Sequence, residues 1–245
     1  MPCNHARDCH LDAPGVSRGL HTLDGMTLQR RVALTRGLAL AGASALGALA
    51  ACGKRKPLGR VVPAGSRVLA LGDSLTFGTG ATPETSYPTV LAAMSGWQVI
   101  NAGVPGDTSA QALERLPALL QEHTPALVLV SIGGNDLLRR LPEADTRANL
   151  QRICELAQGA GAQVLLLAVP RPSVAAAFIG SLSDHPIYAE VGTALKLPLH
   201  AQGWASVLAD ESLRFDAIHA NARGYAQMAR GVYDAALAHG LAQAR

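Results

Sequence analysis

Five short apolar runs, separated by segments long enough to be helices, constrain the fold of this chain more than any other feature of its sequence. The runs cover residues 67–71, 98–101, 127–132, 163–169 and 197–200. They are rich in Val, Leu and Ile, as strands that are buried on both faces must be. The other segments predict helices at 87–94, 109–122, 147–160, 187–195 and 222–238. This alternation predicts an α/β fold of three layers, in which helices cover both faces of a flavodoxin-like parallel sheet of five strands.

Polar stretches that contain glycine follow the first three runs. They read LALGDSL, VINAGVPGDTS and LVSIGGND, and they place Asp73-Ser74, Gly106-Asp107 and Asn135-Asp136 after successive strands. Because the strands of a parallel sheet end at a common edge, these residues are expected to converge from distant positions in the chain. A ligand site is therefore predicted at this edge.

Ser74 is the candidate nucleophile of this site. It follows a strand, where its hydroxyl is exposed and its backbone N–H can face a developing negative charge. His219, in RFDAIHANARGY, is the candidate base, and Asp216 stands close enough to orient the imidazole. Gly106 and Asn135 could donate hydrogen bonds to an oxyanion. Taken singly, each has a plainer interpretation: Ser74 as a helix N-cap, the histidine as a surface residue beside a turn, and Asn135 as a turn residue.

Taken together, these blocks resemble the SGNH hydrolases of the GDSL lipase/esterase family, and most closely the bacterial thioesterase I, lysophospholipase and arylesterase-like subgroup. The resemblance runs through GDSL at 72–75, NAGVPGDTSAQALERLPALL at 101–120, LVLVSIGGND at 127–136 and DAIH at 216–219. It implies the SGNH hydrolase fold. It also implies that Ser74 is the nucleophile and that His219 is the base, with Asp216 as its carboxylate. Gly106 and Asn135 are implied as two further oxyanion donors.

One residue departs from the family pattern, because Ala220 stands where many members have proline after the histidine. This difference leaves the rigidity of the histidine loop open. The resemblance implies no cofactor and no metal, and the sequence holds no zinc or calcium motif.

The function implied by the resemblance is that of a serine esterase or thioesterase acting through an acyl-serine intermediate. Acyl esters, acyl-CoA or lysophospholipids are the implied substrates, and a carbohydrate acetylesterase stays open. The apolar residues that would wall an acyl pocket are Leu137, Leu138, Leu141, Phe178, Ile179 and Leu182. The same residues fit equally well as packing beneath the loops.

Two other classes of function are compatible with the predicted fold. TFGTGAT at 76–82 resembles a flavodoxin phosphate loop, which would suit a flavin-binding electron carrier, although an aromatic content of 4% leaves few rings to sandwich the flavin. A catalytically inactive, lipid-anchored binding module would keep the pocket without turnover. The charge distribution argues against nucleic acid as a partner. Nine of the 21 lysines and arginines precede residue 61, so the rest of the chain is slightly acidic.

The leading segment predicts export. We expect residues 1–25 to be a mis-assigned start or a disordered extension, 26–51 to be a lipoprotein-type signal peptide, and 52–66 to be a tether to a hydrolase domain at 67–245.

Attachment to a membrane is predicted at Cys52. Basic residues at 30, 31 and 36 precede an apolar stretch that ends in LAAC, which resembles the lipobox whose cysteine carries the lipid anchor. Ordinary cleavage near Ala51 is the alternative. The expected location is the bacterial periplasm, with the protein anchored to a membrane by lipid.

Overall fold

The computed structural model describes residues 58–172 and 181–244. The chain divides into two units, 1–54 and 55–245, and all structural statements below concern the second unit. Cys52, Phe178 and Ile179, together with the predicted signal peptide and residues 52–57 of the predicted tether, lie outside the described residues.

The centre of the fold is a sheet of five parallel strands, which confirms the predicted fold class. The strands are β1 (Arg67–Gly72), β2 (Gln98–Gly103), β3 (Leu127–Ser131), β4 (Gln163–Leu167) and β5 (Leu199–His200). Their order is β2-β1-β3-β4-β5. In β1 every residue after Arg67 is buried, and β3 is buried throughout. This burial explains why these runs lack the polar alternation of a half-exposed strand.

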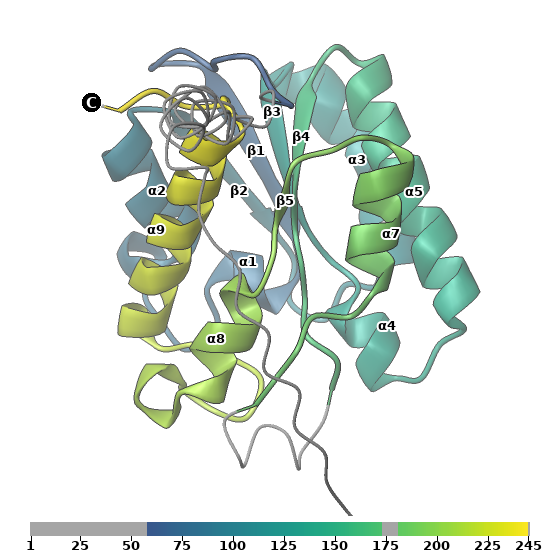
Figure 1. The fold of residues 1–245 in the computed structure, drawn as a ribbon, viewed down its shortest axis with the longest axis vertical. Coiled ribbons are helices and arrows are strands. Elements are labelled where there is room, and N and C mark those ends of the chain that lie inside the picture. The colour runs from purple at the N-terminus through teal and green to yellow at the C-terminus, as the bar shows by residue number, and fades with distance from the viewer. Residues whose placement is uncertain (1–57, 173–180, 245) are drawn as a thin grey trace, which may run out of the picture. The chain divides into compact units, whose positions relative to one another are not determined.

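Helices cover both faces of the sheet (Figure 1). On one face α2 (Tyr87–Ser95) packs against α9 (Ala222–Ala238), which also contacts α8 (Gly203–Ala209). On the other face α5 (Glu143–Gly159) packs between α3 (Ser109–His123) and α7 (Ile187–Ala194). Asn221 caps α9, because its side chain accepts hydrogen bonds from the N–H groups of Arg223 and Gly224.

Several short elements were not predicted. They are α1 (Ser74–Phe77), α4 (Gly134–Leu138), α8 and the 3-10 turns η2 (Pro83–Thr85) and η3 (Glu211–Leu213). Elements of one or two turns are too short to show an apolar period. The prediction for α5 began four residues late, because its first turn is marked by the acidic Glu143 and Asp145 rather than by apolar residues.

The strands after β3 are shorter than predicted. β4 ends at Leu167 and β5 has two residues, whereas runs of 163–169 and 197–200 were expected. Val169 and Pro170 stay buried as irregular chain that leads into the site, which accounts for their apolar character. Among residues 58–172 and 181–244, no helix is both long and apolar enough to cross a membrane.

Candidate active site

The carboxyl ends of β1, β2 and β3 lie at one edge of the sheet, as the parallel pairing requires. Gly72 pairs with Gly103 in β2 and with Ser131 in β3, so the three loops that follow start at the same level. These loops carry Ser74, Gly106 and Asn135. The segment before α9 joins them from a distant part of the chain.

Ser74, His219 and Asp216 form a continuous hydrogen-bonded arrangement. His219 Nε2 lies 3.0 Å from Ser74 Oγ, across 145 positions of sequence. His219 Nδ1 lies 2.7 Å from Asp216 Oδ2, while Asp216 Oδ1 accepts hydrogen bonds of 2.8 Å from the N–H groups of Ile218 and His219. The geometry brings together the three side chains that the sequence analysis placed in one site.

The charge of Asp216 is favoured where it lies. Burial acts to raise the pKa of this carboxyl, but hydrogen bonds from the His219 ring and from the N–H groups of Ile218 and His219 outweigh it, so the pKa lies below its usual value. An ionised carboxylate on Nδ1 keeps the proton on that nitrogen. His219 Nε2 is then free to accept the Ser74 hydroxyl proton.

Backbone hydrogen bonds close the histidine loop. The Phe215 N–H donates to the His219 carbonyl at 2.9 Å, and the Asn221 N–H donates to the Leu213 carbonyl at 2.8 Å. The Asn221 amide also donates to the Arg214 carbonyl at 3.1 Å. Ala220 is fully buried beneath this loop. These bonds restrain the loop without the proline that many family members carry after the histidine.

Two backbone N–H groups at this edge are free to bind an anion. Ser74 is the first residue of α1, and Gly106 has a φ of +86°, a backbone conformation that glycine adopts without strain. In the part of the chain that the structure describes, neither N–H donates to a protein acceptor. Both therefore suit an oxyanion at a carbonyl attacked by Ser74.

Asn135 lies at the same edge but is already engaged. Its Nδ2 donates to the Asp107 carbonyl at 2.9 Å and lies 3.4 Å from Asp73 Oδ2. The first bond joins the loop after β3 to the loop after β2. The second, longer contact leaves one amide hydrogen to be redirected toward a substrate oxygen.

Asp73 is a site residue to which the sequence analysis gave no role. It is buried, caps α1 by accepting from the Leu75 N–H at 3.0 Å, and contacts Asn135. Desolvation raises the pKa of Asp73 to about 6, although the Leu75 hydrogen bond and the charge of His219 act in the opposite direction. The signal in the sequence that could have identified Asp73 as a site residue was its position directly before the candidate nucleophile.

Polar contacts behind the site hold the loops together. Arg115, on α3, donates to Asp107 at 2.7 Å and to the Gly72 carbonyl at 2.9 Å, which links the loop after β2 to the end of β1. Buried Asp136 accepts from the Ser109 N–H and hydroxyl at 2.8 and 2.5 Å. The hydrogen bonds to Asp136 fix the start of α3 against α4.

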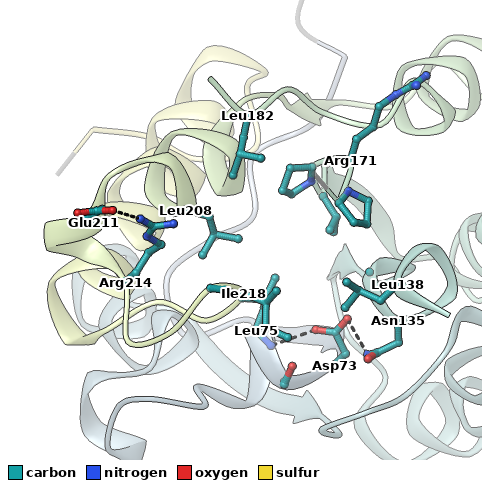
Figure 2. A pocket seen from close by; sticks show the side chains of 16 residues that line it. Asp73, Leu75, Asn135, Leu138, Arg171, Leu182, Leu208, Glu211, Arg214 and Ile218 are labelled. Carbon is teal, nitrogen blue, oxygen red and sulfur yellow. Dashed lines mark hydrogen bonds and ion pairs between the residues drawn. The ribbon is translucent and has the colours of Figure 1, made fainter. Parts of the chain in front are cut away.

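A cavity of about 240 Å³ opens beside Ser74 (Figure 2). Of the predicted pocket residues, Leu138 and Leu182 line it. Leu137 and Leu141 are not among the residues that line it. Leu138 shares a face of α4 with Asn135, three residues earlier, whereas Leu137 lies on another face. Leu141 follows the helix and is 41% exposed.

The rest of the cavity wall was not predicted. It is largely aliphatic, and its additional lining residues include Leu75, Val169, Pro170, Leu208, Arg214 and Ile218. Most of these come from the ends of buried runs, so sequence alone could not separate them from core residues. Within the described ranges, no group of three or more His, Cys, Asp or Glu residues could hold a metal ion.

The parallel sheet and the Ser-His-Asp geometry at its carboxyl edge define a class of protein, the serine hydrolases of three-layer α/β fold. The family follows from comparison with known proteins. The chain belongs to the GDSL-like Lipase/Acylhydrolase family, whose model matches residues 70–227.

Related proteins carry names that include thioesterase, lysophospholipase and esterase. "Thioesterase 1/protease 1/lysophospholipase L1" of Escherichia coli K12 is 41% identical over 110 residues, which make up 43% of this chain and 52% of the relative. "Esterase TesA" of Pseudomonas aeruginosa is 41% identical over 110 residues, or 43% of this chain and 55% of the relative. The match thus spans about half the length of these curated relatives.

Solved structures agree over a longer region. The crystal structure of TesA has a TM-score of 0.62 and 30% sequence identity, covering 69% of this chain and 97% of that chain. A second solved structure is that of the psychrotrophic esterase EstA from Pseudoalteromonas sp., inhibited by monoethylphosphonate. It has a TM-score of 0.59 and 26% sequence identity, and the match covers 69% of this chain and 96% of that chain. These matches extend the family relationship over most of the described domain.

Proposed function

We propose that this protein hydrolyses carboxylic esters or thioesters through an acyl-serine intermediate. The observation that carries the proposal is the path of hydrogen bonds from Ser74 Oγ to His219 Nε2 and from His219 Nδ1 to Asp216, at 3.0 and 2.7 Å. The names of the relatives, which describe a thioesterase and an esterase, support the same chemistry.

Each step uses groups that already lie at the site. Ser74 Oγ attacks the carbonyl carbon while His219 Nε2 takes the hydroxyl proton, and the carbonyl oxygen becomes an oxyanion held by the N–H groups of Ser74 and Gly106 and the Asn135 amide. The intermediate collapses as the bond to the leaving oxygen or sulfur breaks, and His219 gives that atom its proton. Water then repeats the sequence: it loses a proton to His219, attacks the acyl carbon and releases the acid, while His219 returns the proton to Ser74.

An apolar acyl group is the substrate portion that the surroundings favour. The cavity beside Ser74 is lined mainly by aliphatic side chains. Exposed large apolar side chains also lie on the short helices and loops of this edge, at Phe77, Val104, Leu138, Leu141, Phe215 and Ile218. Acyl esters, acyl-CoA and lysophospholipids present such a group, whereas a sugar acetate offers only a methyl group to this wall.

We further propose that the protein is exported and anchored by lipid at Cys52 on the periplasmic side of a membrane. The proposal rests on the basic, apolar and LAAC stretches of residues 26–52 alone. Two or more acyl chains hold a protein stably on a bilayer, whereas one chain does so only marginally.

The esterase proposal is tested with Ser74→Ala. We expect this variant to fold and to lose hydrolysis of 4-nitrophenyl hexanoate and labelling by a fluorophosphonate probe. Ser66→Ala, which alters a serine before β1 at the opposite edge of the sheet, is the matched control and should keep both. Retention of turnover by Ser74→Ala would refute the assignment. An inactive wild-type protein that still binds the ester would indicate the binding module instead.

A further inference from the structure

Arg214 places a guanidinium in the aliphatic wall of the cavity. It follows η3 and lines the cavity together with Leu182, Leu208 and Ile218. Figure 2 shows Arg214 beside Leu208, whereas Arg171, the other arginine of the lining, extends away from the cavity. Of the two arginines, Arg214 therefore lies beside the aliphatic wall, where its guanidinium is paired with Glu211, which also lines the cavity.

The Arg214 side chain is partly buried, and its charge is incompletely paired. Its side chain is 13% exposed, and Nη2 lies 3.0 Å from Oε1 of Glu211, whose own side chain is 81% exposed. Asp210 is also close enough for the arginine charge to help lower its pKa, after hydrogen bonds from Ser212. Among the described residues, Glu211 is the only ion-pair partner of Arg214, and residues 171–182 contain no Asp or Glu.

The structural contacts of Arg214 involve its backbone, apart from the ion pair with Glu211. The backbone around Arg214 is held by the Asn221 amide and by pairing with Ala220, neither of which uses the guanidinium. An ion pair with a solvent-exposed carboxylate stabilises a fold very little, whereas burying a guanidinium in an aliphatic wall is unfavourable unless it is paired. Arginine carries five N–H donors in a planar fork, and the pair with Glu211 leaves most of them unused.

We infer that Arg214 binds a negatively charged group of the substrate, a carboxylate or a phosphate, that an apolar segment separates from the scissile carbonyl. The inference rests on the proposed esterase function and narrows its substrate to amphipathic, anionic esters or thioesters. The aliphatic wall between Ser74 and Arg214 accommodates the apolar segment, and the guanidinium fork matches the oxygens of the anion. Glu211 competes with that anion for the same fork.

The anion can belong to either side of the ester, so the test uses two matched pairs of substrates. The first pair, 4-nitrophenyl hexanoate and the mono-4-nitrophenyl ester of hexanedioic acid, differs in a carboxylate at the end of the acyl chain. The second pair, 4-acetylphenyl and 4-carboxyphenyl hexanoate, differs in a carboxylate on the leaving group. The readout is the ratio of kcat/KM for the charged member to that for the neutral member.

We expect Arg214→Met to lower this ratio roughly tenfold to a hundredfold in at least one pair, because hydrogen bonds to a charged partner are stronger than neutral ones. Arg214→Lys keeps the positive charge but lacks the planar fork of donors, so its ratio should lie between those of Arg214→Met and the wild type. Glu211→Gln should act in the opposite direction and raise the ratio. Arg230→Met, which removes an exposed positive charge from α9, is the matched control and should leave the ratio unchanged.

A purely structural role would give a different result. If Arg214→Met lowers kcat/KM equally for the charged and neutral members of both pairs, the inference fails while the esterase proposal stands. If the folded wild-type protein hydrolyses none of the four esters, both fail. Raising the ionic strength should lower the wild-type ratio and leave that of Arg214→Met unchanged, since only the former depends on charge attraction.

Discussion

At the scale of single residues, the site contains two carboxylates in opposite surroundings. The surroundings of Asp216 favour its ionised form, whereas those of Asp73 oppose ionisation. Asp216 receives three hydrogen bonds and has a lowered pKa. Asp73 is fully enclosed, and its pKa rises to about 6. The first holds the imidazole in the tautomer that a base requires. The second caps the helix that starts at Ser74, at a cost in stability whenever it is ionised.

Asp73→Asn should therefore become more stabilising, relative to wild type, as the pH rises from 4 to 7. An unfolded Asp73 ionises near 3.8 and the folded one near 6, so the native state retains a proton that the unfolded state has lost, and stability falls over this interval. The shift corresponds to roughly 3 kcal/mol. Asparagine keeps the cap but cannot ionise. Urea unfolding at pH 4, 5, 6 and 7 measures the difference between the two proteins.

Asp210→Asn is a contrasting variant, for which the opposite dependence of stability on pH is expected. Hydrogen bonds from Ser212 lower the pKa of Asp210, so the stabilisation that Asp210 provides is lost as the pH falls through its folded value. Asp210→Asn should therefore lose stability, relative to wild type, as the pH rises. A difference between Asp73→Asn and wild type that does not change with pH would contradict the burial argument.

Asn135→Ala should lower kcat on the order of 100- to 1000-fold, the usual cost of losing one oxyanion donor. KM should change little, because the lost interaction forms with the transition state rather than with the ground state. The same change removes the bond to the Asp107 carbonyl, so thermal unfolding is measured in parallel. A drop in kcat/KM that arises from KM alone would assign Asn135 to substrate binding instead.

At the scale of elements, the sequence predicted the long helices and failed on the short ones that carry the site. The cap and apolar face of α9 identify it, because Tyr225, Met228 and Val232 recur at helical spacing and are buried. Ser74 instead lies in α1, a single turn whose signals are only the Asp73 cap and a left-handed Gly78 at its end. Tertiary contacts rather than local propensity fix such turns in place.

Gly103→Ala should displace α1 and reduce both stability and activity. A Cβ at Gly103 would lie 2.1 Å from the backbone nitrogen of Phe77, at the end of α1, and no change of side-chain rotamer relieves a clash with backbone. We expect a loss of about 1–3 kcal/mol and a lower kcat, because α1 carries Ser74.

Gly159→Ala is the matched control for this change. Gly159 is the last residue of α5, and a Cβ there would meet nothing within 4 Å. Its stability should stay the same or rise by roughly 0.5 kcal/mol. Thermal unfolding and ester hydrolysis of both variants distinguish the specific clash at Gly103 from a general effect of replacing glycine.

Trp204 connects three helices to the centre of the sheet, and this connection can be measured. The indole N–H donates to Ser131 Oγ of β3 at 2.9 Å, and the ring packs edge-on against Tyr87 of α2 and Tyr225 of α9. Trp204→Phe leaves the buried Ser131 hydroxyl unpaired, and Ser131→Ala leaves the indole N–H unpaired, each at about 1–3 kcal/mol in addition to any packing loss. The double variant should cost less than the sum of the two in urea unfolding, whereas strict additivity would show that the bond is unimportant.

At the scale of the whole molecule, the parallel topology is what made the site predictable. Residues as distant as Ser74 and His219 meet because strands β1 to β3 end at one edge and the segment before α9 returns to it. The cavity was less predictable. Its wall includes Val169, Pro170 and Arg214, and the inward position of each depends on how loops pack, which no periodic pattern records.

The proposed lipid anchor gives the last prediction, which concerns the whole chain. Expressed from Met26 in a bacterium, the protein should be labelled by radioactive palmitate and enter the detergent phase of Triton X-114, because acyl chains on Cys52 bind apolar phases strongly. Cys52→Ser should abolish the labelling and move the protein to the aqueous phase, with the specific activity of the purified domain unchanged, since residue 52 precedes the folded hydrolase unit. Cys154, the other cysteine of the expressed chain, is buried in α5 and is left in place in both proteins. Palmitate labelling that persists in Cys52→Ser would rule out this cysteine as the attachment point, and a wild-type protein that is cleaved but unlabelled would indicate ordinary signal cleavage near Ala51.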